Sequence, residues 1–286
     1  MTQKREGESG DSPSLCHHSG EVRGLLFLLF VPENPLCYNR NVKKGGTMEL
    51  SIDLHTHTIA SGHAYSTLRE NVAWARARGL RIIGTSDHAM AMAGVENNAV
   101  FDNYRAVPRV LDGVVVLCGV EANIVDVDGT IDIHPDRKKL DYAIVSLHKQ
   151  CFTPSSKEEN TDAVINACKH PQVKIVGHPD DARFPLDYER LSDFIVERDL
   201  FCELNNSSLK KNGPRIGAEE NLRVLLGLGK EKNMKIIVGS DAHMDVDVGN
   251  FDLAKALIDE LDYPEDLIVN TWETDRILHA FELMEK

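Results

Sequence analysis

Two histidines stand at alternate positions in the segment Asp53-Leu54-His55-Thr56-His57. The alternation of apolar and polar residues from Leu50 onward predicts a short strand. Residues i and i+2 of a strand point to the same side, so His55 and His57 share one face at the end of this strand. Two neighbouring imidazoles can chelate a divalent metal ion. Taken alone, the pair is equally compatible with ordinary surface or core histidines.

Further candidate ligands follow other apolar segments of the chain. Histidine or carboxylate side chains end six of the seven strands that the sequence predicts. They are His55 and His57, Asp87 and His88, Glu121, His148, His178, and Asp241 and His243, with His63 in a nearby loop. Each has a structural alternative: a helix cap for Asp87, a buried acid for Glu121, or a hydrogen-bonded core imidazole. Their shared position at strand ends favours one polynuclear metal site.

The elements that must bring these residues together alternate along the chain. Strands are predicted at about 50–54, 80–85, 114–120, 142–147, 173–177, 200–204 and 235–239, and helices at about 67–78, 101–110, 159–169, 187–198, 218–232, 251–261 and 273–285. Ser66 is the expected N-cap of the first helix, with Glu70 at capping-box spacing from Thr67. Serial strand–helix units favour a parallel sheet with helices outside. In a parallel barrel the carboxyl ends of the strands converge on one face, where active sites form.

Composition restricts the classes of function. The 286 residues are 42% hydrophobic, and the formal net charge of -13 argues against non-specific binding to nucleic acid or to a membrane. The longest apolar run, 25–31, is too short to cross a bilayer. Six scattered cysteines without a C-x-x-C pair favour a reducing, cytoplasmic location. Residues 1–47 lack a helical or strand period, and we expect a disordered or non-native N-terminal extension before a single domain, 48–286.

Several motifs together resemble the PHP (polymerase and histidinol phosphatase) superfamily. They are DLHTH at 53–57, Ser86-Asp87-His88, Gly177-His178-Pro179 and GSDAH at 239–243. The segments 61–66, 119–124 and 203–208 resemble its stand-alone bacterial zinc phosphatase branch, the YcdX-like proteins. The resemblance covers residues 48–286. It implies an α/β fold, a distorted (β/α)7 TIM-like barrel, with three divalent metal ions at the carboxyl ends of the strands. Zn²⁺ is the usual metal, with Mn²⁺ or Fe²⁺ as alternatives.

The resemblance also implies a ligand set. His55, His57, Glu121 and Asp241 would hold one metal; Glu121 would bridge to a second, completed by His148 and His178; His63, His88 and His243 would hold the third. Glu121 and Asp241 would serve catalysis as ligands, and Asp87 would orient a ligand histidine. The flanking residues Lys149-Gln150 and Asp180-Asp181 depart from the family pattern beside two ligands, where they bear on the choice of substrate.

Three divalent ions suit hydrolysis of a small phosphate monoester, because metals neutralise phosphate charge and lower the pKa of water. Arg183, Lys149, Lys210 and Arg215 are candidates to bind the phosphate, and Asn205-Asn206-Ser207-Ser208 is a candidate for orientation or substrate contact. A histidinol phosphatase, a 3′–5′ exonuclease, an amidohydrolase barrel and a non-catalytic metal-binding protein remain as alternatives. We expect a small phosphorylated substrate and no nucleic-acid or membrane partner. The resemblance suggests a homo-oligomer.

Overall fold

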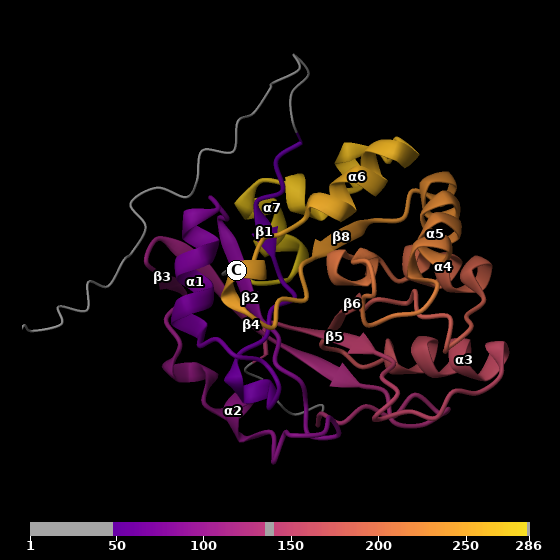
Figure 1. Ribbon diagram of the computed structural model, residues 1–286, viewed down its shortest axis with the longest axis horizontal. Coiled ribbons are helices and arrows are strands. Elements are labelled where there is room, and N and C mark those ends of the chain that lie inside the picture. The colour runs from indigo at the N-terminus through magenta and orange to yellow at the C-terminus, as the bar shows by residue number, and fades with distance from the viewer. Residues whose placement is uncertain (1–47, 135–139, 285–286) are drawn as a thin grey trace, which may run out of the picture. The chain divides into compact units, whose positions relative to one another are not determined.

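The computed structural model describes residues 48–134 and 140–284, so the expected extension 1–47 lies outside the described residues. Seven parallel strands form one curved sheet (Figure 1). They are β1 (Ile52–Asp53), β2 (Ile82–Thr85), β4 (Val114–Asn123), β5 (Tyr142–Ser146), β6 (Val173–Val176), β7 (Phe201–Asn205) and β8 (Ile236–Gly239). Neighbours in the sheet follow chain order, as serial strand–helix units require. The expected α/β architecture is therefore confirmed.

The two outer strands, β1 and β8, nearly close the sheet into a barrel. Just beyond their carboxyl ends, the backbone N–H of His57 donates to Ala242 O (2.9 Å) and that of Asp241 to His55 O (2.9 Å). Further down, the side chain of Asn270 spans the gap. Its amide nitrogen donates to Ile52 O and Val238 O (2.8 Å each), and its oxygen accepts from Val238 N (2.7 Å). The fold is thus a distorted seven-stranded TIM-like barrel.

Helices follow most strands and cover the outside of the sheet (Figure 1). They are α1 (Leu68–Ala77), α3 (Lys157–Ala167), α4 (Tyr188–Glu197), α5 (Ala218–Lys232), α6 (Asp252–Leu261) and α7 (Thr274–Ala280). Helix α1 has the expected capping box with Glu70, but its N-cap is Thr67 and not Ser66. Among residues 48–134 and 140–284, no helix is long and apolar enough to cross a membrane.

The helix expected at 101–110 is wrong. This stretch holds a single turn, α2 (Ala99–Asp102), a 3-10 turn and a two-residue strand, β3 (Val110–Leu111), that pairs antiparallel with β4. Asp112 and Gly113 both adopt positive φ (50° and 85°) and form the tight connection between β3 and β4. Asp-Gly is a strong signal for a two-residue hairpin loop, and here it outweighs the weak helical pattern.

The barrel interior is a packed apolar core separate from the core under the helices. Its members include Leu54, Leu117, Tyr142 and Phe201, and the C-terminal segment adds Trp272 and Phe281. Tyr142 donates its hydroxyl proton to Leu54 O (2.6 Å). A β-carbon on Gly84 would overlap the Tyr142 hydroxyl and one on Gly119 would overlap its ring, so these two glycines make room for the side chain. This core fills the barrel below the strand ends and leaves the carboxyl face for polar side chains.

Candidate metal centre

The predicted ligands converge on Glu121, a buried residue of β4 (1% exposed). Each of its carboxylate oxygens faces imidazole nitrogens from other strand ends. Oε1 lies 2.8 Å from His178 Nε2 and 3.2 Å from His148 Nε2; Oε2 lies 2.9 Å from His88 Nδ1, 3.2 Å from His55 Nε2 and 3.5 Å from His57 Nε2. One carboxylate therefore sits among five histidines from four strand ends.

Asp241, His243 and His63 extend this cluster on one side. Asp241 Oδ1 lies 3.2 Å from His57 Nε2, and His243 Nε2 lies 3.0 Å from His63 Nε2. Four groups of three ligand atoms lie within 4.8 Å of one another: His57, His88 and His243; His55, Glu121 and His178; His55, His57 and Asp241; and His88, Glu121 and His148. The structure therefore brings all nine predicted ligands together. His55, His57, His88 and Glu121 each belong to two groups.

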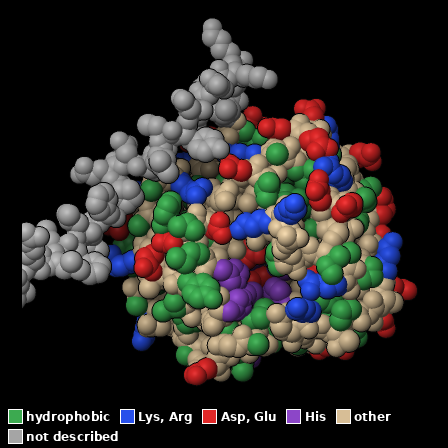
Figure 2. Space-filling view, in the orientation of Figure 1, with side chains coloured by type: hydrophobic (Ala, Val, Ile, Leu, Met, Phe, Trp, Pro, Cys, Tyr) green, Lys and Arg blue, Asp and Glu red, His purple; other side chains and the backbone are tan. Residues whose placement is uncertain are grey.

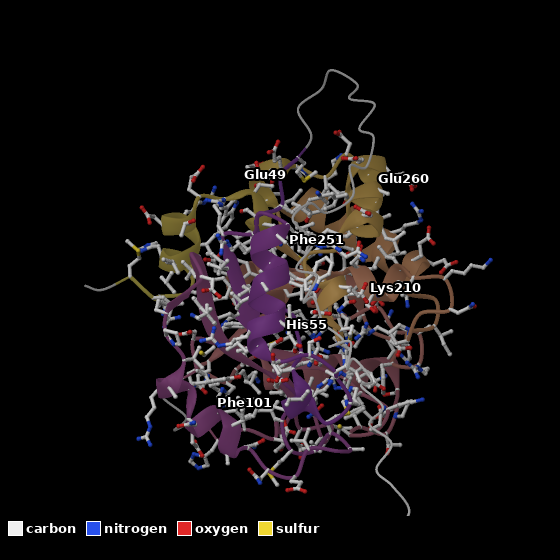
Figure 3. All side chains as sticks on the ribbon, turned by 60° about the vertical axis from the view of Figure 1, so that its left-hand side comes forward. Glu49, His55, Phe101, Lys210, Phe251 and Glu260 are labelled. Atoms are coloured by element: carbon white, nitrogen blue, oxygen red, sulfur yellow. The ribbon has the colours of Figure 1, made fainter. Side chains whose placement is uncertain are left out.

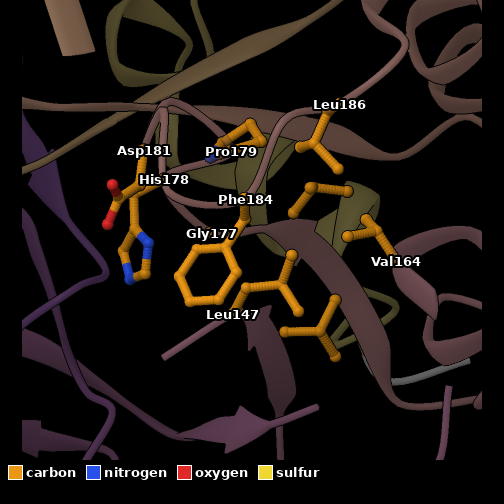
Figure 4. A pocket seen from close by; sticks show the side chains of 10 residues that line it. Leu147, Val164, Gly177, His178, Pro179, Asp181, Phe184 and Leu186 are labelled. Atoms are coloured by element: carbon orange, nitrogen blue, oxygen red, sulfur yellow. The ribbon is translucent and has the colours of Figure 1, made fainter. Parts of the chain in front are cut away.

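The backbone at two of these positions is strained. His178 and Asp241 both have positive φ (25° and 54°), a region that non-glycine residues rarely adopt. Such residues persist only where surrounding structure holds them, and they gather at functional sites. Behind His178, Leu147, Val164 and Phe184 pack closely around a cavity of about 10 Å³ (Figure 4). That space is too small for a ligand, so this apolar wall holds the loop and its histidine in place.

Four buried atoms at the centre of the cluster lack a hydrogen-bond partner. They are His55 Nε2, His57 Nε2, His88 Nδ1 and Glu121 Oε2. Unsatisfied buried polar atoms are costly, and their occurrence together calls for a common partner. Imidazole nitrogens and carboxylate oxygens are the donors that zinc and similar divalent ions accept. The residues present therefore fit a metal centre.

The charges of the cluster also call for a cation. Burial alone would raise the pKa of Glu121, but His88, His55 and His148 together hold that pKa well below its ordinary value. Burial likewise opposes protonation of His55, yet Glu203, Glu121 and Asp241 raise its pKa well above the usual range. Divalent cations bound at this place would balance the negative charge of these carboxylates.

Sequence reasoning missed Glu203, a buried residue of β7 that holds two ligand histidines. Its Oε1 lies 2.6 Å from His55 Nδ1, and its Oε2 accepts the backbone N–H of His178 (2.8 Å). Donation from Nδ1 to Glu203 fixes the tautomer of His55 and leaves Nε2 for a metal. An acid inside an apolar strand is the same signal that singled out Glu121.

Two other ligand histidines are oriented through longer chains of hydrogen bonds. Ser61 donates to Asp87 Oδ1 (2.7 Å), so its oxygen accepts from His57 Nδ1 (3.0 Å). The side chain of Asp87 thus reaches a ligand histidine through Ser61, and its backbone oxygen accepts the N–H of Glu121 (3.1 Å). Asn123 Oδ1 lies 2.8 Å from His148 Nδ1. These contacts direct the Nε2 atoms of His57 and His148 toward Glu121.

A cleft of about 470 Å³ opens onto the cluster. Figure 2 shows histidines exposed in a hollow with basic side chains at its rim, and Figure 3 labels His55 near the centre of the view, beside the lower end of α1. All four predicted phosphate-binding cations line the cleft: Lys149, Arg183, Lys210 and Arg215. Of the segment 205–208, Ser207 lines the cleft. Asn205 donates to Asp241 Oδ2 (3.2 Å), which supports the orienting role expected of that segment.

Comparison with known proteins identifies the family of this chain. The model of the PHP domain matches residues 53–207, more than half of the chain. The chain belongs to the PHP family. A probable phosphatase of Caldanaerobacter subterraneus subsp. tengcongensis is 45% identical over 227 residues, which cover 78% of this chain and 88% of that protein. A probable phosphatase of Clostridium novyi is 41% identical over 227 residues, covering 79% and 92%.

A solved structure shares the fold of this PHP protein. It is the histidinol phosphate phosphatase of Lactococcus lactis subsp. lactis in complex with zinc, L-histidinol and phosphate. The match has a TM-score of 0.55 and 15% identity, and covers 75% of this chain and 95% of the other. At this identity the match supports the barrel fold and says nothing on its own about the substrate.

Proposed function

We propose that this PHP protein is a metal-dependent phosphatase that hydrolyses a small phosphate monoester. The observation that carries the proposal is the cluster of nine potential ligands, with the buried carboxylate of Glu121 at its centre, beneath an open polar cleft. The probable phosphatases among its relatives support the reaction class, and the zinc and phosphate in the Lactococcus structure support a metal-assisted route in the fold.

In this proposal the centre would hold three divalent ions, of which Zn²⁺ suits the ligands best, with Mn²⁺ or Fe²⁺ as alternatives. The proposed division assigns His55, His57, Glu121 and Asp241 to one ion. Glu121, His148 and His178 would hold a second, and His63, His88 and His243 would hold the third. The close approach of His63 Nε2 to His243 Nε2 (3.0 Å) supports the third group. The contacts of Glu121 Oε1 with His148 and His178 support the second.

Bound metals supply charge for the phosphate oxygens and lower the pKa of water, so that hydroxide is present at neutral pH. The protein's own residues hold this centre rigid. Glu203 fixes His55, Ser61 and Asp87 fix His57, and Asn123 fixes His148. Arg215 donates to Asp241 Oδ2 (2.9 Å) and leaves Oδ1 facing His57. No side-chain nucleophile is required.

The test is hydrolysis of p-nitrophenyl phosphate by the full chain, together with metal analysis. Activity should disappear with a chelator and return with added zinc or manganese. Glu121→Ala removes the shared ligand and should abolish activity and lower the metal content. Glu197→Ala, at an exposed site on α4, is the matched control. Full activity and full metal content in the Glu121 variant would defeat the proposal.

A further inference from the structure

The histidines and the basic residues that line the cleft come from loops after different strands. The loops after β1, β2 and β8 bring His63, His88 and His243 to it. The loops after three adjacent strands, β5, β6 and β7, bring all four cations, Lys149, Arg183, Lys210 and Arg215. Because neighbouring strands end side by side, the cations form one basic wall beside the ligand cluster. This wall stands out in a chain whose net charge is -13.

Two of the four cations, both arginines, already form hydrogen bonds and ion pairs within the protein. The Arg215 side chain is 9% exposed and bonds to Asp241 Oδ2 (2.9 Å) and Ser208 Oγ (3.1 Å). Arg183 donates through Nε to Asp181 Oδ2 (2.8 Å) and through Nη2 to Pro214 O (2.7 Å). These contacts fix the loop between β7 and α5 against the loop after β6. The two arginines of the basic wall are thereby held in place before any ligand binds.

The two lysines remain available to a ligand. Lys149 is exposed at the cleft, and no acidic side chain of the described residues lies within ion-pair distance of it. Lys210 Nζ lies 2.9 Å from Asp247 Oδ2, but both side chains are about one-third exposed (37% and 34%). An exposed lysine–carboxylate pair contributes little, so Lys210 can exchange Asp247 for an anion on a ligand.

The rest of the cleft also indicates a hydrophilic ligand larger than phosphate. Its volume of about 470 Å³ falls within the range of small-molecule sites. Few apolar side chains line it, chiefly Met92, Leu147 and Pro214. A phosphate on the metals would fill only part of this space, and the remainder of the substrate would face the two lysines.

We propose that the substrate is a small phosphate ester with a second anionic group, a carboxylate or another phosphate, which Lys149 and Lys210 bind on the basic wall. This inference rests on the proposed phosphatase function. A substrate whose leaving group carries an ammonium would meet like charge there, so the same wall disfavours amino-phosphates.

The test compares matched substrates with the metal-loaded full chain. 3-Phosphoglycerate, glycerol 3-phosphate and phosphoethanolamine offer an anionic, a neutral and a cationic leaving group. We expect kcat/KM for the anionic substrate to exceed that for the neutral one by about tenfold or more, with the cationic one lowest. Binding of 3-phosphonopropionate should exceed that of propylphosphonate in calorimetry, which gives a readout independent of turnover.

Variants assign the preference to the lysines. Lys149→Gln and Lys210→Gln should each reduce the ratio of kcat/KM between 3-phosphoglycerate and glycerol 3-phosphate several-fold. Lys211→Gln is the matched control, because Lys211 is exposed next to Lys210 and does not line the cleft. Its ratio should equal that of the wild type.

Failure of this inference and failure of the proposed function look different. An enzyme that hydrolyses p-nitrophenyl phosphate but treats the charged and neutral substrates equally, or keeps its preference in both lysine variants, would overturn the anion subsite alone. Metal-loaded protein that hydrolyses no phosphate ester would overturn the phosphatase function and the subsite with it.

Discussion

Glu203 Oε1 lies 2.6 Å from His55 Nδ1, and both side chains are buried, 1% and 2% exposed. The same carboxylate accepts the backbone N–H of His178 through Oε2. A β-carbon on Gly239 would overlap Glu203 Oε1, so β8 must carry glycine there for the pair to form. Glu203 thus couples ligands that belong to two of the proposed metals.

Glu203→Gln should therefore weaken metal binding while the fold remains. The amide keeps the shape but loses the charge that holds His55, and loss of such a partner lowers metal affinity by about 10–100-fold. Zinc affinity measured by competition with a chromophoric chelator checks this. Glu197→Gln on the exposed face of α4 controls for loss of one acid. Unchanged zinc affinity in Glu203→Gln would remove Glu203 from the centre.

Metal removal should destabilise the whole domain. Without ions, four buried polar atoms lose their common partner. A ligand present at about 1,000 times its Kd stabilises a protein by about 4 kcal/mol, so chelation should lower Tm on the order of 10 °C. Calorimetric scans before chelation, after it and after zinc return measure the change. The Glu121→Ala variant should respond less to the chelator. Loss of the metals with no change in Tm would contradict the idea that they complete this core.

Asn270 closes the gap between β1 and β8, so Asn270→Ala should weaken the barrel. The substitution leaves the oxygen atoms of Ile52 and Val238 and the amide of Val238 without their partner. We expect a loss of about 3 kcal/mol in the free energy of unfolding, measured in urea. Asn103→Ala is the control, since Asn103 is exposed and its side chain makes no cap hydrogen bond. Equal stability of the two variants would show that the backbone contacts close the barrel alone.

Gly119 leaves the space that the Tyr142 ring fills, so Gly119→Ala should overpack the barrel. Overpacking of this kind costs about 1–3 kcal/mol. In the double variant with Tyr142→Leu the clash disappears, and the combined loss should be smaller than the sum of the single losses. Gly227→Ala on α5 meets no atom within 4 Å and should be neutral or slightly stabilising. Strict additivity in the Gly119–Tyr142 cycle would rule out the clash.

The sequence by itself predicted the order of the elements and the chemistry of the strand ends. Local patterns suffice for these predictions. Alternating apolar residues indicate a strand with one buried face, and a continuous apolar run such as that in 235–239 indicates a strand buried on both faces. Convergence of His55, Glu121 and His178 also followed, since the carboxyl ends of parallel strands meet on one face. The exception was 101–110, where the Asp112-Gly113 turn makes a hairpin. The roles of the nine ligands stay a prediction that the geometry supports.

The tertiary structure decided the contacts between residues far apart in the chain. Asn270 bridges β1 and β8 because the C-terminal segment returns beneath the barrel, and no local pattern encodes that return. Glu203 reaches His55, 148 residues away, because β7 and β1 both point these side chains inward. The division of the four cations into two fixed arginines and two available lysines likewise depends on which acids lie opposite them. Such pairings follow from barrel closure and packing, which a single sequence does not specify.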